Sequence, residues 1–149
     1  MTEVRRATRD DLDGLVWLRR AWTEERHGVG ADETYARRFA VWFEAEAPRR
    51  SFWLATEDGE PVGMANLVTF ERMPGPGVDA SRWGYLGNMF VASAHRGRGV
   101  GRALLDAVIS HAEAEAFERI VLSPSERSLA FYRRAGFHSA DELLLRPRR

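Results

Sequence analysis

The residues most suited to chemistry form a short glycine-rich segment, residues 96–102, which reads Arg-Gly-Arg-Gly-Val-Gly-Arg. It precedes a segment with helical periodicity, where each glycine would cost a helix interior about 1 kcal/mol relative to alanine. Bare backbone at a helix start exposes unpaired N–H groups and a partial positive charge, which suits a phosphate group. Arg96, Arg98 and Arg102 add formal charge, and arginine can bind phosphate with two hydrogen bonds. The segment therefore predicts an anion site, with a simple helix cap as the alternative.

Two common phosphate-binding motifs do not fit this segment. A lysine-type phosphate loop requires Gly-Lys-Ser/Thr, but Gly101 is followed by Arg102, and the chain contains no lysine. A dinucleotide fingerprint beginning at Gly97 or Gly99 would require glycine in place of Arg102 or Leu104. Backbone amides supplemented by arginine remain as the expected means of binding an anion.

Composition narrows the class of protein. The 149 residues fit one domain, residues 1–149, and the absence of cysteine excludes disulfide scaffolds and cysteine-based zinc or redox sites. Basic and acidic side chains number 22 each, and this neutral balance argues against a nucleic-acid or membrane-surface protein. No apolar run approaches the ~20 residues of a membrane span, and the first residues lack a signal-peptide core. We therefore expect a cytoplasmic domain with no metal site.

Hydrophobic periodicity predicts the elements that position the segment. Thr8 before two aspartates is typical of a helix N-cap, and Asp58-Gly59 is typical of a hairpin turn. Helices are predicted over residues 9–26, from Asp32 to Pro48, 99–117 and 125–135, and strands over residues 2–7, 51–56, 61–70, 83–91, 119–122 and around 143–145. The order β-α-α-β-β-β-α-β-α-β predicts an α/β fold of the α+β type, with a mixed sheet flanked by helices. Phosphate-type ligands are expected where a central strand passes into a helix.

Three segments carry a resemblance to a known family. Residues 96–105 resemble the central motif of the GNAT superfamily of N-acetyltransferases, Arg/Gln-x-x-Gly-x-Gly/Ala. Residues 125–137 are similar to the second motif of that family, and residues 4–15 to its usual first strand and helix. The resemblance spans nearly the whole chain in the right order. It implies a mostly antiparallel sheet of about six to seven strands with about four helices, and acetyl-CoA as the ligand of the glycine-rich segment.

The resemblance also implies which residues hold acetyl-CoA. The backbone of residues 89–91 would pair with the pantetheine amides and direct an N–H group at the thioester carbonyl, although Phe90 and Val91 also suit core packing. Ser125 stands where many relatives have an asparagine that contacts the cofactor. The implied cofactor-binding residues are Met89, Phe90, Val91, Arg96, Gly97, Arg98, Gly99, Val100, Gly101, Arg102 and Ser125.

Proton transfer is only partly assigned. Tyr132 stands where the family carries its general acid, and a phenol with a pKa of about 10 can protonate a leaving thiolate. The alternative is a tyrosine whose ring only packs. Strand 83–91 contains no acidic residue, and Asn88 can orient an amine but cannot take its proton. Glu71, Asp79, His95 and water remain open as the base.

The acceptor side is expected at the first two helices and the loop over residues 71–82. Aromatic residues are frequent in and near these segments, and they suit either core packing or a cleft for an apolar acceptor. They are Trp17, Trp22, Tyr35, Phe39, Trp42, Trp53 and Trp83. The arginine doublets at residues 19–20, 37–38 and 49–50 are expected to face solvent, with a carboxylate-bearing acceptor as the alternative.

Taken together, the sequence predicts an acetyl-CoA-dependent N-acetyltransferase that transfers directly to a primary amine of a small molecule or peptide. A non-catalytic acyl-CoA-binding regulatory module on the same fold is the alternative. An arginine-rich nucleic-acid binder is disfavoured by the zero net charge. The identity of the acceptor, the use of larger acyl groups and a homodimer are left open.

Overall fold

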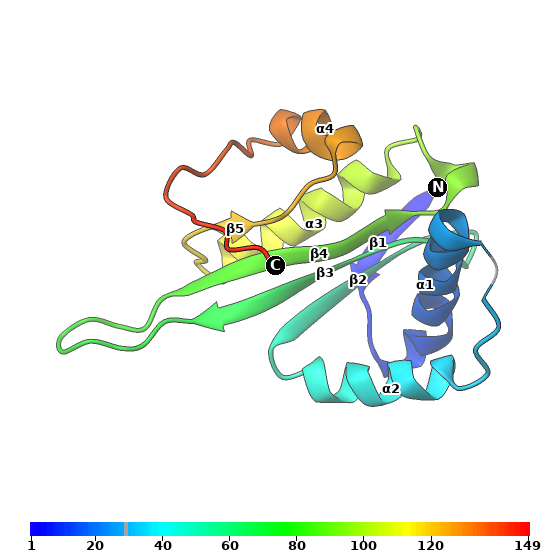
Figure 1. Ribbon diagram of the computed structural model, residues 1–149, viewed down its shortest axis with the longest axis horizontal. Coiled ribbons are helices and arrows are strands. Elements are labelled where there is room, and N and C mark those ends of the chain that lie inside the picture. Colours follow the sequence, from blue (N-terminus) through cyan, green and yellow to red (C-terminus); the bar gives the residue numbers. More distant parts are fainter. Residues whose placement is uncertain (29) are drawn as a thin grey trace.

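The structure, a computed structural model, describes residues 1–28 and 30–149 (Figure 1). Its strands are β1 (Thr2–Arg6), β2 (Arg50–Glu57), β3 (Glu60–Glu71), β4 (Arg82–Val91) and β5 (Ile120–Val121). Its α-helices are α1 (Leu12–His27), α2 (Tyr35–Glu46), α3 (Val100–Ala114) and α4 (Leu129–Arg134), with short 3-10 turns at Arg9–Asp11, Ser93–His95 and Glu126–Ser128. The sheet order is β1-β2-β3-β4-β5, antiparallel throughout except for the parallel β4–β5 pair. The expected mixed α/β fold is confirmed.

Helices cover both faces of the sheet, with α1 and α2 on one side and α3 and α4 on the other (Figure 1). The core under α3 contains the fully buried Leu104, Leu105 and Val108, and the core under α1 contains the fully buried Leu15 and Leu18. These residues recur at helical spacing, so the periodicity that predicted the helices also identified the faces that they bury.

The start of the first helix is held by a capping box. The Thr8 side chain accepts a hydrogen bond from the backbone of Asp10, and the Asp11 carboxylate accepts one from the Thr8 N–H at 2.8 Å. The guanidinium group of Arg5 donates two further bonds to Asp11, at 2.8 and 2.7 Å. The predicted cap at Thr8 is confirmed, although the first turn is a 3-10 turn. The Arg5 hydrogen bonds are the main reason that the pKa of Asp11 lies below its usual value.

Replacing Asp11 with asparagine should lower the free energy of unfolding by about 1–3 kcal/mol at neutral pH, because a largely buried, charge-assisted pair is lost. The folded-state pKa is depressed, so the stabilisation is complete above the unfolded pKa of about 3.9 and disappears as the pH falls through the folded value. Urea unfolding should therefore show a gap between the wild type and Asp11→Asn that closes below about pH 4. Asp13→Asn, on the exposed side of α1, is the control, with an expected change below about 0.5 kcal/mol. A gap that is the same at pH 7 and pH 3 would contradict the assignment.

The sheet has five strands, fewer than the six to seven expected. The prediction of a last strand around residues 143–145 is wrong, since no strand is formed after β5 in the described part of the chain. Leu144 and Leu145 are 100% and 90% exposed. The apolar run suggested a strand, but a strand also requires a partner edge, and no strand of the described chain pairs with this segment. No helix in the described part of the chain is both long and apolar enough to cross a membrane.

Candidate active site

A β-bulge interrupts β4 near its carboxyl end. Asn88 and Met89 of β4 lie opposite the single residue Ala65 of β3, and Asn88 has a φ of 52°. An extra residue in one strand bends that strand and changes the direction of the side chains that follow. The bulge lies within the segment expected to contact the pantetheine arm.

On the side of β5, the edge of β4 has no neighbouring strand near its carboxyl end in the described chain. The parallel pairing joins only Gly84 with Ile120 and Tyr85 with Val121. Beyond Tyr85, no strand of the described chain lies against this edge up to Val91. Unpaired strand edges offer backbone donors and acceptors to an extended ligand, as in strand addition by peptides.

The glycine-rich segment forms a turn directly after this strand. Gly97 and Gly99 have φ values of 74° and 86°, which side chains rarely adopt, and a Cβ atom at either position would meet no atom within 4 Å. The first hydrogen bond of α3 runs from the N–H of Ala103 to the carbonyl of Gly99. Within the described chain, the backbone N–H groups of residues 97–102 donate to no protein acceptor. The turn therefore presents a set of free amides to open space at a helix N-terminus, the arrangement that binds phosphate.

Arg96 connects this turn to α1. Its Nε donates to the carbonyl of Val91 at 2.9 Å, and its two terminal nitrogens donate to the two carboxylate oxygens of Glu25, both at 2.7 Å. This pairing lowers the pKa of Glu25. The guanidinium group also lies over the ring of Phe90 at 5.5 Å. Arg96 therefore holds the turn, the end of β4 and α1 together.

The other charged side chains of the turn are also paired. Arg98 lies 3.7 Å from a carboxylate oxygen of Glu57, and the same oxygen is 2.8 Å from Nδ1 of His95. Arg102 donates to Asp106 one helical turn later, at 2.9 Å. All three arginines of the segment are paired with carboxylates, but within the described chain Arg98 donates no hydrogen bond and Arg102 donates only through Nε, so arginine donors remain available beside the backbone amides. His95 is held at the end of β2.

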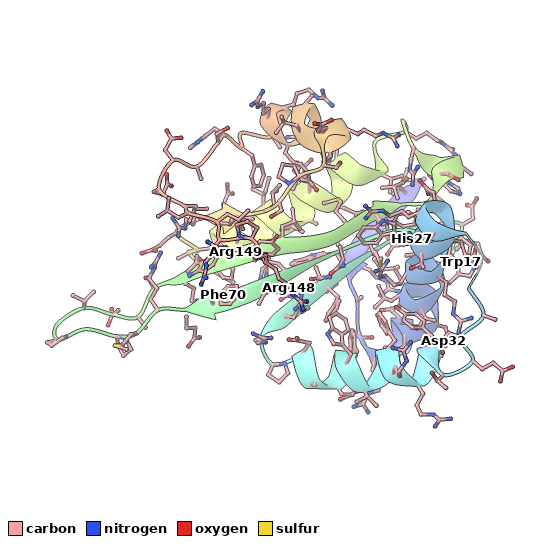
Figure 2. All side chains as sticks on the ribbon, viewed as in Figure 1. Trp17, His27, Asp32, Phe70, Arg148 and Arg149 are labelled. Atoms are coloured by element: carbon pink, nitrogen blue, oxygen red, sulfur yellow. The ribbon has the colours of Figure 1, made fainter. Side chains whose placement is uncertain are left out.

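A pocket of about 270 Å³ lies on the opposite face of the sheet, between α1, α2 and strands β2 to β4. Its lining residues are Leu15, Arg19, Tyr35, Arg38, Phe39, Trp42, Phe52, Met64, Ala65, Asn66 and Asn88. The walls are mostly aromatic and apolar, and Asn88 at the bulge and Asn66 of β3 form the polar floor. Of the expected aromatics, Tyr35, Phe39 and Trp42 line the pocket, and Trp22 stacks on Phe90 at 5.6 Å. Trp17 points away from the sheet and is 52% exposed (Figure 2).

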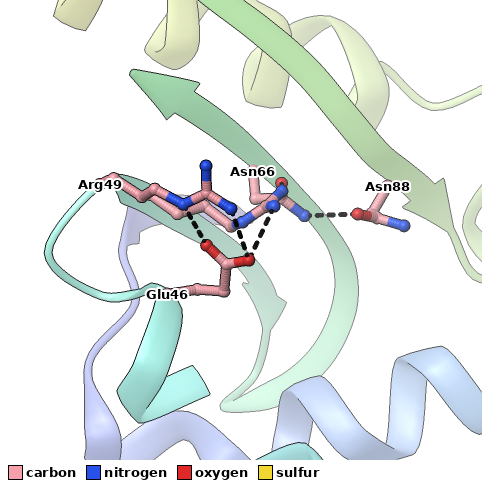
Figure 3. A network of polar contacts seen from close by, with 5 residues as sticks. Glu46, Arg49, Asn66 and Asn88 are labelled. Carbon is pink, nitrogen blue, oxygen red and sulfur yellow. Dashed lines mark hydrogen bonds and ion pairs between the residues drawn. The ribbon is translucent and has the colours of Figure 1, made fainter. Parts of the chain in front are cut away.

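A chain of hydrogen bonds fixes the polar floor of the pocket (Figure 3). Arg50 donates to the side-chain oxygen of Asn66 at 2.6 Å, and the amide nitrogen of Asn66 donates to Asn88 at 2.8 Å. Glu46 lies 3.5 Å from Arg50 and also accepts from Arg49. The Asn88 side chain is thus oriented by its neighbours at the bulge, consistent with the expected role in orienting an amine.

The candidate bases do not line this pocket. Glu71 pairs with Arg82 at the outer end of the β3–β4 ladder, and Asp79 lies in the loop beyond, where the hairpin projects from the body of the molecule (Figure 1). Arg82 is six residues before Asn88, which corresponds to roughly 20 Å along a strand. The pocket lining within the described chain contains no Asp, Glu or His, and no group of three or more metal-ligating side chains occurs there. Glu71, Asp79 and His95 therefore lie outside this pocket in the described chain.

Tyr132 of α4 is 8% exposed and packs among aromatic rings. Its ring makes edge contacts with Phe131 and Phe137, at 5.1 and 5.7 Å between centroids. It belongs to the core cluster that also contains Leu86 of β4 and Val100 of α3. Burial raises its pKa above the usual value. The ring borders a cavity of about 640 Å³ between α3, β5, α4 and residues 135–143, and it does not line the 270 Å³ pocket.

Ser125 performs a local structural task. Its hydroxyl lies 2.9 Å from that of Ser128, and its N–H donates to the Ser128 hydroxyl at 3.0 Å. This capping box starts the 3-10 turn that leads into α4. The Ser125 hydroxyl would therefore contact the cofactor while it also keeps its hydrogen bond to Ser128.

Sequence reasoning missed two arginines of the pocket. Arg19 and Arg38, each one half of a doublet expected to face solvent, line the pocket. Helical spacing contains the missing signal, because Arg19 follows the buried Leu15 by four residues. Arg38 lies at i+3 from Tyr35 on the aromatic face of α2.

Comparison with known proteins now adds to this geometry. The acetyltransferase (GNAT) family profile matches residues 13–137. The chain belongs to the GNAT acetyltransferase family. No curated protein sequence matches this GNAT protein.

Solved structures show the same fold. A predicted acetyltransferase with acetyl-CoA from Clostridium acetobutylicum is 23% identical, with a TM-score of 0.77 over 99% of this chain and 96% of the other. A GCN5-related N-acetyltransferase from Ralstonia eutropha is 26% identical, with a TM-score of 0.72 over 99% of both chains. Glucosamine-6-phosphate N-acetyltransferase from Arabidopsis thaliana is 16% identical, with a TM-score of 0.73 over 99% of this chain and 98% of the other. The similarity in fold to each of these structures covers 99% of this chain.

Proposed function

We propose that this GNAT-family protein is an acetyl-CoA-dependent N-acetyltransferase that transfers an acetyl group directly to a primary amine of a small molecule or peptide. The observation that carries the proposal is the set of free amides over residues 97–102, which follows the open edge of β4. The amides suit the pyrophosphate, and the open edge suits the amide groups of the pantetheine arm. The pocket at the bulge, on the other side of β4, is available to the acceptor.

In this proposal the residues share the tasks of acyl transfer. The backbone of Met89, Phe90 and Val91 holds the arm and directs an N–H group at the thioester carbonyl, where negative charge develops. The amine nitrogen forms the new C–N bond, the C–S bond breaks, and Tyr132 donates its phenolic proton to the departing thiolate. The raised pKa of Tyr132 keeps that proton in place at neutral pH.

The proton released by the amine passes to water, because no carboxylate or imidazole lines the described pocket. Asn88, held by Asn66, orients the amine but takes no proton. The absence of cysteine agrees with direct transfer, since the chain supplies no thiol nucleophile.

The free amides of residues 97–102 and the open edge of β4 also support a second candidate function, a non-catalytic acyl-CoA-binding regulatory module. The described lining of the 270 Å³ pocket contains no candidate base, and Tyr132 packs between aromatic rings. Both features are compatible with a protein that binds acyl-CoA without catalysis. Such a module would use the glycine turn and the edge of β4 in the same way.

Calorimetry with acetyl-CoA, combined with an assay for CoA thiol release, separates these functions. The proposed enzyme binds acetyl-CoA and releases CoA only when a suitable amine is present. Binding without amine-dependent release across a broad amine panel would favour the regulatory module. Failure to bind acetyl-CoA would overturn both.

A further inference from the structure

The pocket at the bulge combines features that select an acceptor. We propose, on the basis of the proposed function, that the acceptor is a small primary amine that also carries a carboxylate and an apolar or aromatic body. This is the chemistry of an apolar α-amino acid. The carboxylate binds Arg19, the body lies against the aromatic walls, and the amine faces the bulge.

The walls and size of the pocket determine the body of the acceptor. Tyr35, Phe39, Trp42 and Phe52 form an aromatic wall, in which Phe39 and Trp42 lie 5.5 Å apart and Trp42 meets Phe52 edge-on at 5.6 Å. The volume of about 270 Å³ lies just below the roughly 300–1,000 Å³ of pockets for drug-sized ligands. A small apolar or aromatic group fills such a space, and an oligosaccharide-sized acceptor does not.

Arg19 is the lining cation without a carboxylate partner in the described chain. Its Nη1 lies 3.2 Å from the hydroxyl oxygen of Thr23, and its guanidinium group lies over the ring of Trp22 at 4.6 Å. The other lining cation, Arg38, is paired with Asp32. A guanidinium group that is oriented by stacking but lacks a counter-ion suits a carboxylate, which it can bind with two parallel hydrogen bonds.

Arg19 lines the same pocket as Asn88 of the bulge. The ring of Trp22, under its guanidinium group, stacks on Phe90 at 5.6 Å, and Phe90 immediately follows the bulge. A carboxylate at Arg19 therefore keeps the acceptor in the pocket that Asn88 also lines. A compact acceptor that carries both an amine and a carboxylate, such as an α-amino acid, suits a pocket of about 270 Å³.

The charge of the pocket disfavours polycationic acceptors. Its lining contains two arginines and no carboxylate within the described chain. A positive environment lowers the pKa of a bound ammonium group, which eases loss of its proton to water where no lining base is available. A second ammonium group on the acceptor would only be repelled. Polyamines and aminoglycosides are thus poor acceptors for this pocket.

The test uses pairs of amines that differ only in the carboxylate. The pairs are L-phenylalanine with 2-phenylethylamine, L-tryptophan with tryptamine, and L-leucine with 3-methylbutylamine, and spermidine and kanamycin serve as polycations. CoA release from acetyl-CoA by the full chain gives kcat/KM for each amine. We expect at least one amino acid to exceed its decarboxylated partner by about 10- to 100-fold. Both polycations should be poorer still.

Arg19→Met should reduce that preference to within about threefold, and Arg19→Lys should restore part of it. Arg37→Met, on the exposed side of α2, is the matched control and should leave the preference unchanged. Quenching of tryptophan fluorescence by N-acetyl-L-phenylalanine and N-acetyl-L-leucine gives a binding readout that is independent of turnover, because Trp42 lines the pocket.

Failure of this inference and failure of the proposed function give different results. Turnover of spermidine, kanamycin or the decarboxylated amines in preference to the amino acids would overturn this inference and leave the proposed function standing. The same holds for an amino-acid preference that survives Arg19→Met. Binding of acetyl-CoA without turnover of any amine would overturn the proposed function itself.

Discussion

Replacing Gly99 with leucine should weaken acetyl-CoA binding by about 100-fold or more while the protein remains folded. The residue has a φ of 86° at the start of α3, and its missing side chain leaves the amides of residues 97–102 open. Leucine would extend into the space that we assign to the pyrophosphate. A loss of 100-fold corresponds to about 2.7 kcal/mol, the scale of several lost hydrogen bonds to a charged group. Calorimetric titration with acetyl-CoA measures the effect.

The backbone strain of this substitution has a matched control elsewhere in the chain. Gly59, in the β2–β3 turn, has a φ of 82°, and a Cβ atom there also meets nothing within 4 Å. Gly59→Leu and Gly99→Leu should therefore each lower the free energy of unfolding by about 1–2 kcal/mol, the cost of a side chain in left-handed backbone. Gly59→Leu should leave acetyl-CoA affinity intact. Equal losses of affinity in the two variants would show that strain, and not a blocked cradle, was responsible.

Replacing Tyr132 with phenylalanine should lower kcat by about 10²- to 10³-fold, the lower part of the usual range of about 10²- to 10⁴-fold for a general acid. Phenylalanine retains the ring contacts with Phe131 and Phe137, so the fold and the acetyl-CoA affinity should change little. Steady-state kinetics with the best amine provides the measurement. Tyr85→Phe is the control, because its hydroxyl bonds Ser123 at the β4–β5 pair, outside the proposed chemistry. Retention of more than half of kcat in Tyr132→Phe would assign the residue to packing alone.

The pH dependence of the wild type follows from the same residue. Burial disfavours the phenolate and so raises the pKa of Tyr132 above its usual value of about 10. The group therefore stays protonated throughout the neutral and mildly alkaline range, and kcat should show no decline assignable to an acid between pH 7 and about pH 9.5. A decline centred near pH 8 that disappears in Tyr132→Phe would contradict a raised pKa.

Local sequence patterns predicted much of the fold. The stripe of Leu104, Val108 and Ala112 identified α3 and its buried face, and the Asp58-Gly59 pair identified the β2–β3 hairpin. Such patterns are local, because a few neighbouring residues determine the periodicity of a helix or the φ requirement of a turn. The predicted strand around residues 143–145 failed for the opposite reason. A strand requires a partner, and the sequence of one segment does not specify whether another edge is available.

Part of the candidate site could likewise be predicted from local sequence, and part of it could not. The glycine turn was predictable because three glycines at a helix start are a local signal. The carboxylate partners of the turn were not, since Glu25 lies 71 residues from Arg96 and Glu57 lies 38 residues from His95. The pocket-lining position of Arg19 was accessible in principle, because helix geometry alone places it on the side of Leu15.

The short β4–β5 pairing has a consequence for local opening of the molecule. Backbone pairing joins β5 to the sheet over only two residue pairs, whereas β2, β3 and β4 are joined by long ladders. Elements with few such links open at a lower free energy than the whole protein unfolds. Amide hydrogen exchange over residues 120–134 should therefore be faster than over β2 and β3. Acetyl-CoA bound between β4 and α4 would bridge the two parts, and so should slow exchange over residues 120–134 more than elsewhere. Unchanged exchange there at saturating acetyl-CoA would place the ligand on one side of that junction only.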